Sequence, residues 1–106
     1  MENIKLELVG MVWYKSEDYD AILRIMADRE KLPASFHIWL MKAETGEKQF
    51  RREGKIVVRT FIDPKTFPEW CRSRGLDIDA KARMEFSNTV AYDTYRRRQG
   101  ESSTTH

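Results

Sequence analysis

The chain has 106 residues, of which 41% are hydrophobic and 34% are charged, and its formal net charge is +2. This length fits one domain, and the composition is typical of a globular protein with a heavily charged surface. The single cysteine, Cys71, excludes an intramolecular disulfide, and no apolar run approaches the roughly 18–20 residues of a membrane span. The first residues lack a basic region followed by an apolar stretch, so we expect no signal peptide and a cytoplasmic protein.

The sequence contains no recognisable catalytic or metal-binding motif. A Gly-rich phosphate loop, a GxSxG element and a CxxC pair are all absent. His37 is the only internal histidine, which is too few for a histidine-based metal site. We therefore expect no catalytic residue, no metal ligand and no cofactor.

Residues 4–14 are predicted to form the first strand. Ile4, Leu6 and Leu8 alternate with charged residues, which is the period of two of a half-buried strand. Gly10 interrupts the apolar stretch that follows, and a β-bulge is expected there. An ordered tail over residues 1–8 is the alternative.

A helix is predicted over residues 17–30. Ser16 is a suitable cap, and the acidic residues after it suit the positive end of the helix dipole. Leu32-Pro33 ends the helix, because the residue before a proline avoids the helical region. Four apolar side chains share one face at helical spacing: Tyr19, Ile22, Leu23 and Met26.

Residues 35–50 are compatible with two structures. Apolar residues recur at helical spacing after Ser35, a suitable cap, but Phe36 to Met41 is also a short apolar run that fits a strand. Good helix formers follow this run, so helix is favoured. Gly46 weakens the helical interpretation, since glycine costs about 1 kcal/mol relative to alanine inside a helix.

The clearest strand is Ile56 to Ile62, which is rich in β-branched residues and ends at Asp63-Pro64. A short helix is expected next. Thr66 and Glu69 fit a capping box, with Pro68 as the second helical residue. Gly75 is predicted to stop this helix, with Leu76 folding back over its end.

The last predicted helix begins near Asp77 or Asp79 and ends at about Arg98, and the polar residues 100–106 are expected to be a disordered tail. The fold class is thus α+β and mostly helical, with one domain over residues 1–99 in the order β-α-α-β-α-α. Two strands alone are marginally stable in water. Helices must therefore cover the small sheet, or a second copy must extend it, and a homodimer is predicted.

Carboxylates near the predicted strand ends suggest a metal-dependent hydrolase as one alternative. Glu53-Gly54-Lys55 has the ExK form of many nucleases, but no second carboxylate accompanies it. Asp63, Asp77 and Asp79 together have enough oxygens for Mg²⁺. Helix capping explains Asp77 or Asp79 without a metal, and we prefer that interpretation.

Three basic clusters are the candidate contacts for nucleic acid or another anion. Their members are Arg51, Arg52 and Lys55; Arg72 and Arg74; and Arg96, Arg97 and Arg98. Phosphate contacts strengthen nucleic-acid binding without specifying sequence. A solvated surface that complements helix dipoles is the alternative. The three tryptophans fit the apolar faces of their elements and are expected in the core rather than on a base-stacking surface.

Several motifs from Trp13 to Phe86 resemble a family of small uncharacterised bacterial proteins. They are Trp39-Leu40, Gly54-Lys55-Ile56-Val57-Val58, Asp63-Pro64 with Phe67, Trp70-Cys71-Arg72 with Gly75-Leu76, and Ala82-Arg83 with Phe86. The resemblance implies a bacterial cytoplasmic protein and transfers no activity.

The leading hypothesis is a small non-enzymatic protein that acts through protein–protein contacts and self-associates. A nucleic-acid-binding accessory protein that uses the C-terminal basic clusters is the first alternative. A Mg²⁺-dependent hydrolase is the second.

Overall fold

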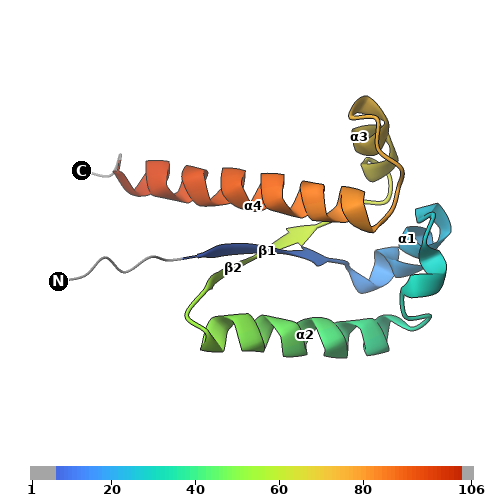
Figure 1. Ribbon diagram of the computed structural model, residues 1–106, viewed down its shortest axis with the longest axis horizontal. Coiled ribbons are helices and arrows are strands. Elements are labelled where there is room, and N and C mark those ends of the chain that lie inside the picture. Colours follow the sequence, from blue (N-terminus) through green and yellow to red (C-terminus); the bar gives the residue numbers. More distant parts are fainter. Residues whose placement is uncertain (1–6, 104–106) are drawn as a thin grey trace.

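The computed structural model describes residues 7–103. Within them the elements follow the predicted order β-α-α-β-α-α (Figure 1). Their bounds are β1 Leu8–Trp13, α1 Tyr19–Ile25, α2 Phe36–Arg52, β2 Ile56–Phe61, α3 Phe67–Ser73 and α4 Ala80–Ser103, with short 3-10 turns at Ser16–Asp18 and Arg29–Lys31. The α+β class and the mostly helical content are confirmed.

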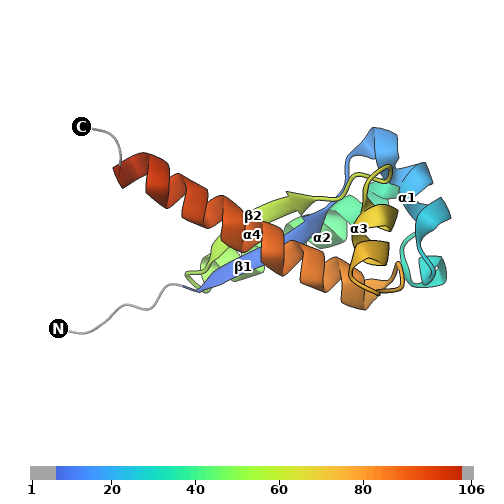
Figure 2. The same ribbon diagram turned by 90° about the horizontal axis from the view of Figure 1, so that it is seen from above.

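The two strands form a parallel sheet whose pairing runs without a break from Leu8 opposite Ile56 to Trp13 opposite Phe61. α2 lies on one face of this sheet and α4 on the other, so the molecule has three layers (Figure 1). Both strands begin at one end of the molecule, the entry end, and both stop at the other, the exit end. α1 and α3 lie at the exit end (Figures 1 and 2).

The expected bulge at Gly10 is wrong, because the strand pairing is regular on both sides of this residue. The glycine is explained instead by α4, which crosses β1 at this point (Figure 2). A Cβ on Gly10 would lie 2.5 Å from the carbonyl oxygen of Ser87 and 2.8 Å from the Cβ of Ala91. Residues 4–6 of the predicted strand lie outside the described residues.

The single helix predicted over residues 17–30 is also wrong. α1 ends at Ile25, and the chain continues through a turn into the 3-10 turn Arg29–Lys31. The Ala27 N–H leaves the helical pattern and donates to the carbonyl oxygen of Ile78 at 2.7 Å. A tertiary bond therefore replaces the last helical turns.

The helical interpretation of residues 35–50 is confirmed by α2. The hydroxyl of Ser35 caps it by accepting a hydrogen bond from the N–H of Ile38 at 3.4 Å. The helix ends at Arg52, with Glu53 as its C-cap, and Gly54 follows with a positive φ of 83°.

α3 begins as predicted, with Thr66 at the N-cap position and Pro68 as the second helical residue. The Thr66 side chain makes no capping bond, so the expected capping box does not form. Instead the backbone carbonyl of Asp63 accepts from the N–H of Phe67 at 2.9 Å. The predicted stop is confirmed, since Gly75 has a φ of +67° and the Leu76 N–H donates back to the carbonyl of Cys71.

α4 begins where expected, because the Asp79 carboxylate accepts from the N–H of Ala82 at 3.2 Å. The helix runs to Ser103 rather than ending near Arg98. Residues 104–106 of the expected tail lie outside the described residues.

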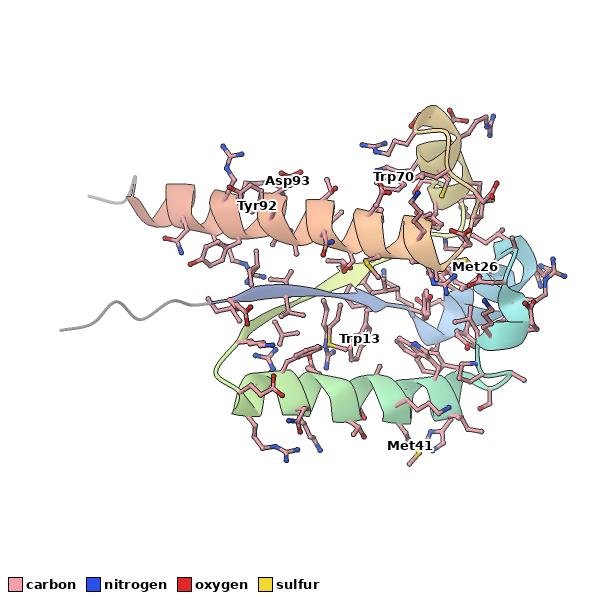
Figure 3. All side chains as sticks on the ribbon, in the orientation of Figure 1. Trp13, Met26, Met41, Trp70, Tyr92 and Asp93 are labelled. Atoms are coloured by element: carbon pink, nitrogen blue, oxygen red, sulfur yellow. The ribbon has the colours of Figure 1, made fainter. Side chains whose placement is uncertain are left out.

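Two aromatic clusters fill the core. One lies mainly between the sheet and α2, and its rings belong to Trp13, Tyr14, Tyr19, Phe36 and Trp39. The other joins α3 to α4, and its rings belong to Phe67, Trp70 and Phe86. All three tryptophans therefore pack inside the domain, as predicted (Figure 3 labels Trp13 and Trp70).

Candidate interaction surfaces

The structure separates the predicted basic clusters between the two ends of the molecule. The C-termini of α2 and α4 both lie at the entry end, on opposite faces of the sheet, whereas α3 lies at the exit end (Figure 1). The entry-end group is therefore Arg51, Arg52, Lys55, Arg96, Arg97 and Arg98. Arg72 and Arg74 are at the exit end and cannot contribute to the same continuous surface.

Part of this positive charge is neutralised within the molecule. Arg51 lies 3.5 Å from the Glu47 carboxylate, and the Lys55 ammonium lies 3.2 Å from Glu53 and 3.4 Å from Glu7. The hydrogen bond to Glu53, followed by that to Glu7, raises the pKa of Lys55. These contacts place the ExK motif in a surface ion-pair network.

The exit-end arginines are likewise engaged locally. Arg72 pairs with Glu69 at 2.9 Å, and the Arg74 guanidinium stacks over the Trp70 ring at 4.1 Å. The side chains of Arg52, Arg96, Arg97 and Arg98 are exposed. Arg52 is in the last turn of α2, where a cation offsets the negative helix end, whereas the three arginines of α4 precede its last turn.

An ion pair on the α2 face was not predicted. Glu47 is buried in α2 and accepts two hydrogen bonds of 2.8 Å from Arg59 of β2. The same guanidinium lies 4.0 Å from the ring centroid of Trp13. The bond from Arg59 holds the pKa of Glu47 below its usual value. One signal was available in the sequence: Glu47 shares the inner stripe of α2 with Ala43 and Phe50.

A second unpredicted ion pair ties the turn after α1 to α4. Arg83 donates hydrogen bonds of 2.8 and 3.0 Å to the two oxygens of Asp28, and each side chain is only 11% exposed. The bonds from Arg83 lower the pKa of Asp28, and the Ala80 N–H contributes in the same direction. The Asp28 carboxylate thus lies beside the first turn of α4. Burial raises the pKa of the neighbouring Tyr14 to about 12.

Three of the four carboxylates considered for Mg²⁺ have other partners. Asp79 caps α4, Asp63 accepts from the N–H of Lys65 at 2.9 Å, and Glu53 accepts from Gln49 and pairs with Lys55. Among residues 7–103, no three His, Cys, Asp or Glu side chains converge in a way that would hold a metal ion.

Cys71 is fully buried, and burial raises its pKa, so it is packed as a core residue rather than presented as a nucleophile.

Two shallow hollows lie at the exit end. The larger, about 480 Å³, is bordered by Ile25, Pro68, Arg72, Leu76 and Ile78, among others. The smaller, about 230 Å³, lies where the strands stop and has charges of both signs on its rim. None of the described buried side-chain N or O atoms lacks a hydrogen-bond partner, so no unsatisfied buried atom points to a ligand in either hollow.

Both edges of the sheet are open, since residues 7–103 contain no third strand. The Ile56 N–H donates to Glu7 at 2.9 Å, and the Ile62 N–H donates to Trp13 at 3.1 Å. Alternate residues face the partner in a parallel ladder. The backbone polar groups that point away from the sheet therefore belong, on β1, to Leu8, Gly10 and Val12, and on β2 to Val57, Arg59 and Phe61.

Large apolar side chains are exposed on both helical layers. Met84 and Tyr92 of α4 are 65% and 57% exposed, and Ile38 and Met41 of α2 are 50% and 56% exposed. Figure 3 shows Met41 on the outward side of α2, away from the sheet. These apolar side chains, together with the unpaired backbone groups at the sheet edges, are the parts of the described surface that would gain most from being buried.

Comparisons with protein families, curated proteins and solved structures give no match. Of the helices in residues 7–103, none combines the length and the apolar character that crossing a membrane requires.

Proposed function

We propose that this is a small non-enzymatic protein that works through protein–protein contacts and associates with itself. The observation that carries the proposal is the two-stranded sheet with two open edges. Helices cover its faces, but edges present N–H and C=O groups that another strand satisfies readily. The exposed Met and Tyr side chains of α4 support the same conclusion, because apolar groups on a surface favour association.

The test is the molar mass in solution, measured by light scattering across a wide range of protein concentration. We expect a dimer that dissociates on dilution. A monomer at the highest concentration would contradict self-association. Turnover of any substrate that a single point variant abolishes without unfolding the protein would contradict the non-enzymatic assignment.

A second candidate function, nucleic-acid binding, is favoured by one observation: exposed arginines of α2 and α4 share the entry end. Fluorescence anisotropy of labelled DNA and RNA at two salt concentrations tests it. Binding through these arginines should weaken steeply with salt and on changing Arg96, Arg97 and Arg98 to Ala. Arg72→Ala with Arg74→Ala, at the exit end, is the matched control. Equal losses in both variants, or no salt dependence, would exclude an entry-end site.

A bacterial origin and a cytoplasmic location accompany the leading proposal as expectations from the sequence. The basis for both is the motif resemblance between Trp13 and Phe86, together with the single, buried Cys71.

A further inference from the structure

We infer that the second copy docks on the open edge of β1, so that two α4 helices lie side by side and antiparallel across a two-fold axis. This inference rests on the proposed self-association and specifies the surface that mediates it. The assembled sheet would have the strand order β2-β1-β1-β2, with both α4 helices on one face and both α2 helices on the other.

The two open edges differ in charge, and this difference selects β1. β1 has the sequence LVGMVW, with no charged residue and no proline. Free edges in natural sheets are commonly protected by charges, prolines or bulges, and β1 has none of these. β2 carries Arg59, whose side chain lies on the α2 face and is 42% exposed, and because Glu47 is shared with Arg51 this group stays net positive. Pairing β2 with its own copy would bring two Arg59 side chains close together, whereas β1 meets its copy without like charges.

Helical geometry places three exposed residues of α4, Met84, Asn88 and Tyr92, on the flank next to β1. Successive helical residues project about 100° apart. Ser87 faces the sheet, so Phe86 and Asn88 project to opposite flanks. Phe86 packs against Trp70 of α3 at 5.3 Å, which marks the α3 flank. Ala91 projects from the Asn88 side and meets Gly10 of β1, which marks that side as the β1 flank.

Three residues form a stripe on this β1 flank: Met84, Asn88 and Tyr92, the α4 stripe. Residues four apart stack along a helix face. Met84 and Tyr92 are each four residues from Asn88. A two-fold axis at Asn88 would therefore place the α4 stripes of the two copies against each other in antiparallel orientation. Met84 of each copy would meet Tyr92 of the other, a favourable sulfur–aromatic contact. The Asn88 amide, with donors and an acceptor, would pair with its own copy.

Cross-linking tests the position of the two-fold axis. Under mild oxidation, Asn88→Cys should give a disulfide-linked dimer, because the two side chains meet at the axis. Met41→Cys, which is also exposed but on the outer side of α2, is the control and should give none. The native Cys71 is buried in both variants. Equal cross-linking of the two variants, or none at Asn88→Cys in a protein that dimerises, would overturn the inference.

A charge substitution on the stripe provides the second readout. Met84→Glu should raise the dissociation constant of the dimer roughly tenfold or more. The substitution places a charge in each of the two symmetric contacts between Met84 and Tyr92. Ile38→Glu on α2 should leave it unchanged, and circular dichroism checks that both variants fold. If the wild type dimerises and Met84→Glu has no effect, this interface is wrong while self-association stands. If the wild type is monomeric, both proposals fail.

Discussion

On the α2 face of the sheet, aromatic side chains occupy the space between helix and strands, whereas on the α4 face the helix backbone itself approaches β1. Trp13 and Trp39 meet edge to face at 5.3 Å on the first side. On the second, Gly10 lies directly beneath Ser87 and Ala91. Side chains can shift when a neighbour changes, but a backbone carbonyl held in a helix cannot. The α4 face should therefore be the less tolerant of substitution.

The arginines of the two ion pairs also differ, in their exposure to solvent. Asp28–Arg83, which fixes the first turns of α4, is nearly inaccessible to water, whereas Arg59 on the α2 face is partly solvated. The Thr60 hydroxyl also donates to the Ser87 hydroxyl at 3.0 Å within the buried α4 face. A buried carboxylate that loses its cation is costly, and both Asp28 and Glu47 are buried, but Glu47 has a second cation, Arg51, at 3.5 Å. Four predictions test this contrast, in order of decreasing effect.

Arg83→Leu should cause the largest loss, about 3 kcal/mol of unfolding free energy, because it leaves the Asp28 carboxylate buried without its partner. Arg59→Leu is the matched control on the α2 face and should cost less, about 1 kcal/mol, because the buried Glu47 keeps Arg51 at 3.5 Å as a partner. Urea unfolding followed by circular dichroism measures both. Equal losses would remove the distinction between the two ion pairs.

Gly10→Ala should cost about 2 kcal/mol, because the added methyl group overlaps a carbonyl oxygen and a neighbouring Cβ. The same urea titration measures this loss. An unchanged stability would show that α4 can move away from β1 freely, contrary to the close contact described above.

Acid should destabilise the protein through Asp28 and Glu47, whose pKa values are both lowered in the folded state. Stability contributed by such groups is present above their unfolded pKa values, near 3.8 and 4.5, and is lost as pH falls through the lower folded values. The loss should be smaller than for Arg83→Leu, because a protonated carboxyl still forms hydrogen bonds. Thermal unfolding from pH 6 to pH 2 measures it.

Asp28→Asn should flatten the acid dependence of stability more than Glu47→Gln, because Arg83, the partner of Asp28, is 11% exposed, whereas Arg59, the partner of Glu47, is 42% exposed. The opposite order would indicate that the α2 face has the stronger ion pair.

Gly46→Ala should have the smallest effect and the opposite sign, a gain of about 0.5–1 kcal/mol. Its new Cβ would meet only the flexible end of Met11 at 3.5 Å, an ordinary contact, and alanine favours a helix interior. The melting temperature should rise by a few degrees. A decrease would show that the α2 face is packed as tightly as the α4 face.

Sequence patterns predicted the elements whose signals are local. The Ser35 cap begins α2, Asp79 begins α4, and Gly75 ends α3, each through bonds to residues within a few positions. The end of α1 could not be predicted, because the partner of Ala27 is Ile78, far along the chain. For the same reason Gly10 was taken for a bulge: the helix that requires it begins seventy residues later.

The basic clusters show the same limitation of sequence patterns, which do not reveal which residues form one site. Charge runs identified the arginines, but the direction of each helix decides which of them share a surface. α2 and α4 point to the same end, so Arg52 and Arg96 lie there, while Arg72 is displaced to the other end by α3 (Figure 1). The exposed Met84 and Tyr92 were not singled out, because their significance depends on the flank of α4 that faces β1.

The first strand of this protein is covered by its last helix, which has a consequence for folding during synthesis. Contacts between β1 and α4 join segments about seventy residues apart, so they form only after a large loop closes. Until α4 leaves the ribosome, one face of β1 is uncovered. The six residues of β1 carry no charge that would oppose aggregation during this time. A truncated chain that ends before Ala80 would therefore leave this face of β1 without its covering helix.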